Sequence, residues 1–184
     1  AITDKTKLVV LPFPNNPTGA IMEKADLEAI AEVIKKHDLF VLSDEIYCEL
    51  TYGGKNHISI AAIDGMYERT VVINGFSKSY AMTGWRIGYA AGPAKLIGAM
   101  KNIQSQSTSN PTSISQVAAE AALNGPQDVL QPMIEAFKRR HDLVVNGLNE
   151  INGISCLPAD GAFYAYANIR PLIRAKGMKS CTEF

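Results

Sequence analysis

Cysteine and histidine are scarce in this sequence, with three of each among 184 residues. No two cysteines have the C-x-x-C spacing and no histidines are paired as ligands, so neither residue type predicts a metal site. The odd cysteine count favours reduced thiols, and we expect a cytoplasmic protein. Cys48 is interpreted as a buried, inert thiol, because a reactive one requires an electropositive setting that the sequence does not indicate.

Excess charge and long apolar runs are also missing. Eighteen basic residues balance eighteen acidic ones, so no overall field would recruit nucleic acid or a charged membrane surface. No apolar run has the length of a membrane helix, and the start shows no charged-then-apolar leader. The chain has no initiator Met and stops at Phe184, where a new helix could begin, so we expect both ends to lie inside a longer protein.

Short apolar runs alternate with amphipathic stretches over the first two thirds of the chain. The predicted strands are residues 7–13, 39–43, 70–73 and 85–91. The predicted helices are residues 23–37, 93–104 and 111–123. The strands are too short for helices and too continuous to be half exposed. We therefore predict an α/β fold whose mostly parallel sheet is sandwiched by helices.

A long helical pattern over residues 126–151 follows, and it tolerates Pro132 near its start. Its predicted buried positions are Leu130, Ile134, Phe137, Leu143 and Leu148. Beyond it the sequence becomes β-rich and is interrupted by turn residues. We place a domain boundary near Pro132, with residues 1–131 in a large domain and residues 132–184 forming a connecting helix and the start of a smaller α+β domain.

Three polar segments stand directly after predicted strands, at residues 15–17, 43–45 and 75–78. Because ligands of open α/β sheets collect beyond the carboxyl ends of the strands, we expect these segments to converge on one site. No strand is followed by a glycine-rich nucleotide motif of the G-x-G-x-x-G or P-loop type, which disfavours a nucleotide-binding domain.

Lys78 is the first candidate for chemistry. A lysine beside small hydroxyl residues after a buried strand can lose part of its hydration, which favours the neutral amine that attacks aldehydes. Taken alone, it is more typical of a solvated surface residue. The same segment, however, supplies Arg86, which can grip a phosphate in fork geometry, and the short hydroxyl of Ser77. Together they meet the needs of a phosphorylated aldehyde cofactor.

Asp44 supplies a further requirement, because a carboxylate beside a pyridine nitrogen keeps that nitrogen protonated. Its alternative role is a turn cap. Glu45 points to the opposite face of an extended chain, so only one of the two can face a ring. Tyr47 can donate its phenol to a ring oxygen or simply pack in the core. Asn16 lies in a proline-fixed turn that can aim its amide inward, although the segment is also ordinary turn chemistry.

These segments together resemble the class I and II aminotransferases, especially the bacterial aspartate-aminotransferase-like branch. The resemblance rests on Pro14-Asn15-Asn16-Pro17-Thr18-Gly19, Ser43-Asp44-Glu45-Ile46-Tyr47 and the run from Gly75 to Tyr89, and extends to residues 106–110 and 161–164. It implies fold type I and pyridoxal 5′-phosphate as cofactor.

By this resemblance Lys78 is the Schiff-base lysine and proton shuttle, and Asp44 partners the pyridine nitrogen. Tyr47 and Asn16 would contact the ring oxygen, and Ser77 and Arg86 would hold the phosphate. The implied activity is transfer of an amino group between an amino acid, aspartate first, and a 2-oxo acid, in a homodimer.

The sequence also departs from the family pattern. Gly75 stands where many relatives have a serine that helps to bind phosphate. The family's glycine- and serine-rich phosphate loop, its ring-stacking aromatic residue and its arginine for the substrate carboxylate have no counterpart here. We therefore expect the chain alone to be unable to transaminate at a useful rate.

Two alternatives stay open. A carbon–sulfur β-lyase or a cyclopropane-forming synthase shares these motifs, because the cofactor stabilises the same carbanion and the protein decides its fate. An aminotransferase-like domain can also serve as the effector-sensing part of a transcription regulator.

Overall fold

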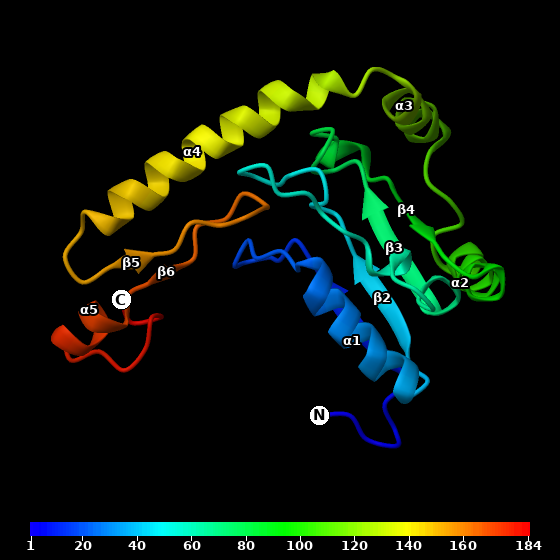
Figure 1. Ribbon diagram of the computed structural model, residues 1–184. Coiled ribbons are helices and arrows are strands. Elements are labelled where there is room, and N and C mark those ends of the chain that lie inside the picture. Colours follow the sequence, from blue (N-terminus) through cyan, green and yellow to red (C-terminus); the bar gives the residue numbers. More distant parts are fainter.

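The computed structural model describes residues 1–184 and contains one four-stranded sheet in the order β1-β2-β3-β4. The strands are β1 (Leu8–Pro12), β2 (Phe40–Asp44), β3 (Thr70–Gly75) and β4 (Gly88–Ala91). The first three are parallel and β4 is antiparallel to β3 (Figure 1). The predicted mostly parallel α/β sheet is confirmed, and the run 85–91 forms a strand only in its second half.

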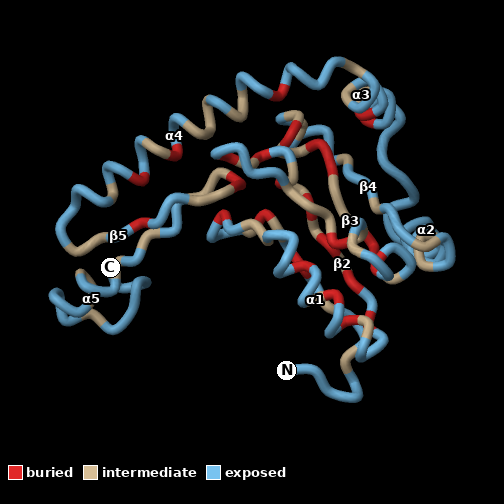
Figure 2. Tube along the Cα trace, in the orientation of Figure 1, coloured by how far each residue is buried: buried red, intermediate tan, exposed pale blue.

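Helix α1 (Lys24–Lys36) connects β1 to β2 and covers one face of the sheet. A capping box between Glu23 and Asp26 starts it, so its bounds agree with the predicted 23–37 within one residue. Its inward residues follow helical spacing. They pack with β1 and β2 in a core formed by Leu11, Leu27, Ala31, Ile34, Leu39, Val41, Ile60 and Met66 (red in Figure 2). Each large aliphatic side chain buried here contributes about 1.5–3 kcal/mol.

The opposite face of the sheet is open at β1 and β2. Leu8 is 48% exposed, Val10 55% and Phe40 43%, and all three alternate with less exposed neighbours along their strands. The helices expected over 93–104 and 111–123 do not cover this part of the sheet within the chain. A continuous apolar run shows that a face is suited to burial, but not which segment buries it.

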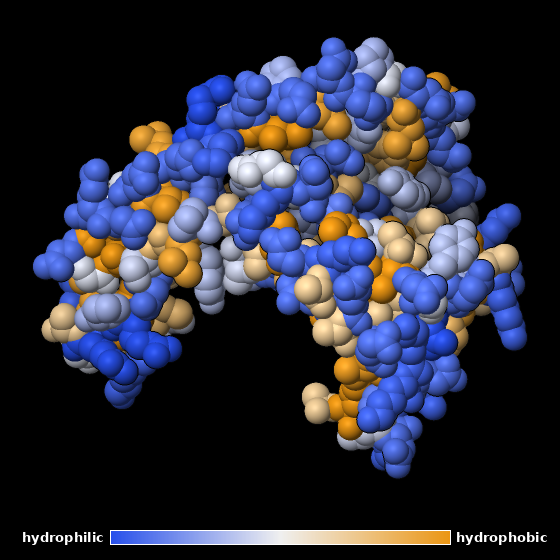
Figure 3. Space-filling view, in the orientation of Figure 1, coloured by the Kyte–Doolittle hydropathy of each residue, from blue (hydrophilic) through white to orange (hydrophobic).

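The two helices concerned are α2 (Ala94–Ser107) and α3 (Ser113–Asn124), beyond the β4 edge of the sheet (Figure 1). Helix α2 has no buried residue, and α3 buries only Ser115 and Ala119. On α3, Ile114 is 71% exposed and Val117 67%. Hydrophobic side chains are accordingly visible over α3 in the space-filling view (Figure 3).

The long predicted helix is α4 (Gln131–Asn149), preceded by the 3-10 turn η4 (Asp128–Leu130), and Pro132 lies in its first turn. Its inward stripe contains Leu130, Ile134, Phe137, His141, Val145 and Leu148. The prediction for Leu143 is wrong, since this residue is 75% exposed. Successive members of the stripe are three or four residues apart, and Leu143 lies two from both His141 and Val145.

The last part of the chain forms a two-stranded antiparallel sheet, β5 (Ser155–Cys156) with β6 (Ala167–Asn168), and helix α5 (Arg170–Ala175). The loop between these two strands returns to the segment that follows β2, where Thr51 pairs with Gly161 in an isolated bridge. Figure 1 shows α4 spanning the distance between the large sheet and this second layer. None of the helices has the length and apolar character required to cross a bilayer.

Candidate functional site

Asp44 and Glu45 diverge at the end of β2, as the two-residue period of a strand predicts. Glu45 shares the α1 side of the sheet with Ser43 and is 5% exposed. Asp44 is half-buried on the other side, and its Oδ1 accepts from the Ile46 N–H at 3.3 Å. Asp44 therefore caps the local turn and also keeps a carboxylate oxygen available on the open side of the sheet.

Glu45 is held by three polar side chains. Ser43 Oγ donates to Glu45 Oε1 at 2.8 Å and Ser59 Oγ donates to the same oxygen at 2.6 Å. His57 Nε2 lies 3.0 Å from Oε2, at ion-pair distance but off the hydrogen-bond direction. Burial opposes the charge, yet these partners outweigh it, and the pKa of Glu45 stays below its ordinary value of 4.5.

The phenol of Tyr47 sits at the centre of an aromatic group. Tyr47 is 5% exposed, and its Oη hydrogen-bonds to the Oη of Tyr164. The Phe163 ring meets the Tyr47 ring edge-on, at 5.4 Å between centroids and an interplanar angle of 86°. Burial, and to a smaller extent the negative charge of Asp44, raise the pKa of Tyr47, so its phenol is protonated at neutral pH.

Lys78 points its amine at the same aromatic group. Its Nζ lies 5.9 Å from the centre of the Tyr47 ring and 5.5 Å from that of Phe163. The residue is half-buried and has no carboxylate partner within the chain. A surface lysine in an ion pair is therefore not what the structure shows; the amine faces rings that stabilise a cation without neutralising it.

The turn from β3 to β4 links Ser77 to Arg86. Thr83 Oγ1 donates to the Ser77 carbonyl at 2.9 Å, and Arg86 Nη1 donates to the Thr83 carbonyl at 2.8 Å. Arg86 itself adopts a left-handed backbone conformation, with φ of 51°. Where this connection begins and ends, Gly75 faces Gly88 and the two strands lie close together. A Cβ at Gly75 would lie 3.0 Å from the Gly88 Cα.

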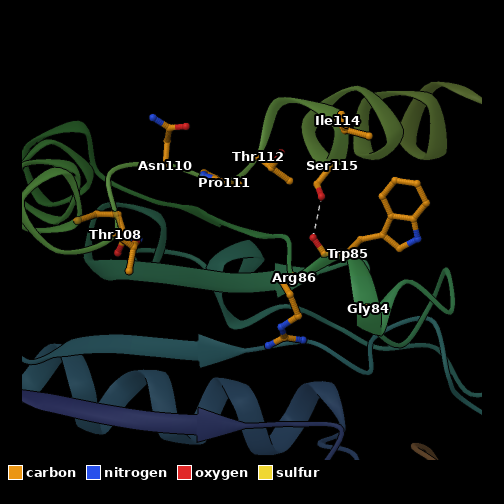
Figure 4. A pocket seen from close by; sticks show the side chains of 10 residues that line it. Gly84, Trp85, Arg86, Thr108, Asn110, Pro111, Thr112, Ile114 and Ser115 are labelled. Atoms are coloured by element: carbon orange, nitrogen blue, oxygen red, sulfur yellow. Dashed lines mark hydrogen bonds between the residues drawn. The ribbon is translucent and has the colours of Figure 1, made fainter.

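A cavity of about 680 Å³ opens beside this turn. Figure 4 shows Arg86 extending from the turn towards the strands, while Ser115 Oγ donates to the Trp85 carbonyl at 2.7 Å. The cavity is lined by Gly84, Trp85, Arg86, Gln104, Thr108, Asn110, Pro111, Thr112, Ile114 and Ser115. The lining combines hydroxyl and amide groups with Arg86, whose guanidinium points away from them towards the strands and can offer its N–H groups to an anion such as a phosphate there (Figure 4).

Asn16 is exposed and makes no side-chain hydrogen bond within the chain. The turn is organised instead by Asn15, whose Oδ1 accepts from Thr18 Oγ1 at 2.7 Å. The turn is hydrogen-bonded to the loop between β5 and β6, since the Gly161 N–H donates to the Gly19 carbonyl at 2.8 Å. The amide of Asn16 is thus free to bind a ligand, but no contact within the chain links it to Tyr47 or Lys78.

Cys48 lies next to this region and behaves as expected of an inert thiol. Burial raises its pKa to about 11, although Asn74 Nδ2 donates to its sulfur at 3.1 Å. At neutral pH the group is a thiol and not a thiolate.

Sequence reasoning assigned no role to Tyr164, His57 or Ser59. The Gly161 turn was the only signal near Tyr164, and it marks a bend without indicating a partner. His57 and Ser59 lie in a loop whose sequence has no periodicity.

The Lys78 amine and the Asp44 carboxylate both lie near the buried phenol of Tyr47, and the hydroxyl of Ser77 and the guanidinium of Arg86 belong to the connection that also carries Lys78. This donor set suits a ligand that carries an aldehyde for Lys78, a basic ring nitrogen for Asp44, a ring oxygen for Tyr47 and a phosphate for Ser77 and Arg86. Pyridoxal 5′-phosphate has all four groups.

This chain is similar to known proteins over nearly its whole length. The family model described as aminotransferase class I and II matches residues 1–183. An aspartate aminotransferase of Bacillus subtilis is 51% identical over 185 residues, which cover 100% of this chain and 47% of that protein. An aspartate/prephenate aminotransferase of Nitrosomonas europaea is 50% identical over 175 residues, covering 94% of this chain and 44% of that protein.

Solved structures agree with these sequences. The crystal structure of the aspartate aminotransferase from Rhizobium meliloti superimposes with a TM-score of 0.89 at 49% identity, over 91% of this chain and 42% of that one. An aromatic aminotransferase from Pyrococcus horikoshii gives 0.88 at 43% identity, over 92% and 46%. The chain thus spans about half the length of the relatives that it matches.

Proposed function

The chain belongs to the aminotransferase class I and II family, and we propose that it is the cofactor-binding part of a longer aminotransferase. The reaction moves an amino group between an amino acid, aspartate first, and a 2-oxo acid. The observation that carries the proposal is the amine of Lys78, which has no counter-ion and faces the rings of Tyr47 and Phe163. Bound pyridoxal 5′-phosphate would supply an electron-accepting ring next to the reacting carbon.

Each residue has one task in this proposal. Lys78 holds the cofactor covalently, and when its Nζ is released it takes and returns the substrate's α-proton. Asp44 keeps the ring nitrogen protonated, and Tyr47 donates to the ring oxygen together with Asn16. Ser77 and Arg86 hold the phosphate.

The names of the relatives support the substrate class. Proteins named aspartate aminotransferase, aspartate/prephenate aminotransferase and asparagine–oxo-acid transaminase all match at 45–51% identity. These names favour transamination over the β-lyase reaction and over a regulator domain. Assaying cysteine conjugates against a keto-acid acceptor separates the lyase from the transaminase by product.

The setting of the enzyme is also proposed. We infer a homodimer, because family sites are built at a subunit interface, and we infer a cytoplasmic location, which suits the three free cysteines. The division near Pro132 is supported by α4, which leaves the large sheet and ends beside β5.

Borohydride reduction of the full-length protein loaded with pyridoxal 5′-phosphate, followed by peptide mapping, tests the proposal. The label is expected on Lys78 and is lost in Lys78→Ala. Lys95→Ala, which removes a lysine from the exposed start of α2, serves as the matched control and should keep the label. A label on any other lysine in the unaltered protein rules the proposal out. Transamination of a panel of amino acids then defines the donor.

A further inference from the structure

We propose that Tyr164 is a positioning residue that donates its phenol proton to Tyr47, so that the single proton of Tyr47 is directed to the cofactor. The inference rests on the proposed function, because it assigns the direction of a hydrogen bond within the same site. In this proposal Tyr164 contacts Tyr47 and acts through it, without contacting the substrate.

The contact between the two phenols is the starting observation. Their oxygens are in hydrogen-bond contact, and either oxygen can be the donor. The Tyr164 ring meets the Tyr47 ring at 80°, with 5.7 Å between centroids, and Phe163 packs against both. The two oxygens are therefore held together by ring packing as well as by the bond itself.

A phenol has one proton, and this fixes the choice. If Tyr47 donated to Tyr164, it could only accept from other groups and would have nothing to donate to a ring oxygen. If Tyr164 donates, Tyr47 keeps its proton for the cofactor and becomes a stronger donor, because chains of hydrogen bonds polarise one another. Tyr164 is half-buried, so water can satisfy its remaining acceptor capacity, whereas Tyr47 is 5% exposed.

The segment that carries Tyr164 is hydrogen-bonded to the segment that follows β2. Ala162 N–H donates to the Leu50 carbonyl at 2.8 Å, and Tyr52 Oη donates to the Ala162 carbonyl. Gly161 permits this approach, since a Cβ there would lie 2.9 Å from the Leu50 carbonyl oxygen. These bonds place the phenol of Tyr164 independently of any ligand, which is what a positioning residue requires.

The direction of the bond predicts the sign of a spectral change. A donor at the ring oxygen stabilises the negative charge left when the cofactor linked to Lys78 loses its proton, so a weaker donor raises the apparent pKa of that chromophore. The test is a pH titration of the absorption spectrum of the full-length holoenzyme, compared among Tyr47→Phe, Tyr164→Phe and the double variant. Tyr166→Phe is the control, because Tyr166 is 63% exposed two residues further on.

We expect Tyr47→Phe to raise the apparent pKa of the chromophore and Tyr164→Phe to raise it by a smaller amount. The double variant should match Tyr47→Phe alone, and Tyr166→Phe should match the unaltered protein. A downward shift in Tyr164→Phe would show that Tyr47 donates in the opposite direction, and no shift would show that Tyr164 does not act on the cofactor through Tyr47; either result overturns the inference but leaves the proposed function intact. If Tyr47→Phe itself causes no shift, the role of Tyr47 in the proposed function fails, and this inference fails with it.

Discussion

Replacing Glu45 by Gln is expected to destabilise the protein in a pH-dependent way. The carboxylate is 5% exposed and accepts from Ser43 and Ser59, with His57 3.0 Å from its second oxygen. A hydrogen bond to a charged group contributes about 1.5–3 kcal/mol, against about 0.5–1.5 kcal/mol for a neutral one. Glutamine can keep both serine bonds in neutral form, so each weakens by roughly 1 kcal/mol. Glutamine also removes the cost of burying a charge, which offsets part of this loss of stability. It removes the attraction between Glu45 and His57 as well, which adds to the loss, so the net loss is about 1–3 kcal/mol.

The sign of the pH dependence follows from the lowered pKa of Glu45. Its partners favour the charged form in the folded state, so the stability they contribute is fully present above the ordinary pKa of 4.5. That contribution is lost as the pH falls through the still lower pKa of the folded state. Because Gln does not titrate, the gap in unfolding free energy between the two proteins should be full at neutral pH and shrink below about pH 4.5.

Urea unfolding followed by circular dichroism, from neutral pH into this acid range, measures the gap. Glu28→Gln is the matched control: Glu28 lies on the outer side of α1, is 54% exposed and pairs with Lys24 at 3.5 Å. Exposed pairs contribute about 0–1 kcal/mol, so this variant should change little. A gap that stays constant through the acid range, or an equally large effect of Glu28→Gln, would refute the reasoning.

Two further predictions concern packing. Val145→Ala should lower the unfolding free energy by about 1–3 kcal/mol, because Val145 is 5% exposed. Leu143→Ala should lower it by less than about 0.5 kcal/mol, because Leu143 is 75% exposed. Equal losses in urea unfolding would contradict the observed orientation of α4. Gly19→Ala should loosen the attachment of the loop around Gly161, because Gly19 has φ of +68° and an added Cβ would lie 2.6 Å from the Gly161 carbonyl oxygen. Proteolysis should then cut near residue 161 faster than in Gly98→Ala, whose added methyl meets nothing within 4 Å; equal rates would show that the attachment does not depend on this turn.

The sequence by itself determined the local structure. The capping box and apolar spacing set α1 within one residue, and the two-residue period of β2 put Asp44 and Glu45 on opposite sides. The same patterns placed polar segments at three strand ends, and the topology of a parallel sheet brings such ends to one edge. These features are readable because backbone hydrogen bonding and side-chain period depend on neighbours within a few residues.

Only the tertiary structure decided which distant groups meet. Tyr164 reaches Tyr47 across 117 residues of sequence, and His57 and Ser59 close on Glu45 from an irregular loop. Apolar runs likewise indicated faces suited to burial but not which segment covers each face. Such contacts depend on the path of the whole chain and on which side chains compete for the same space, and neither is encoded in a local period.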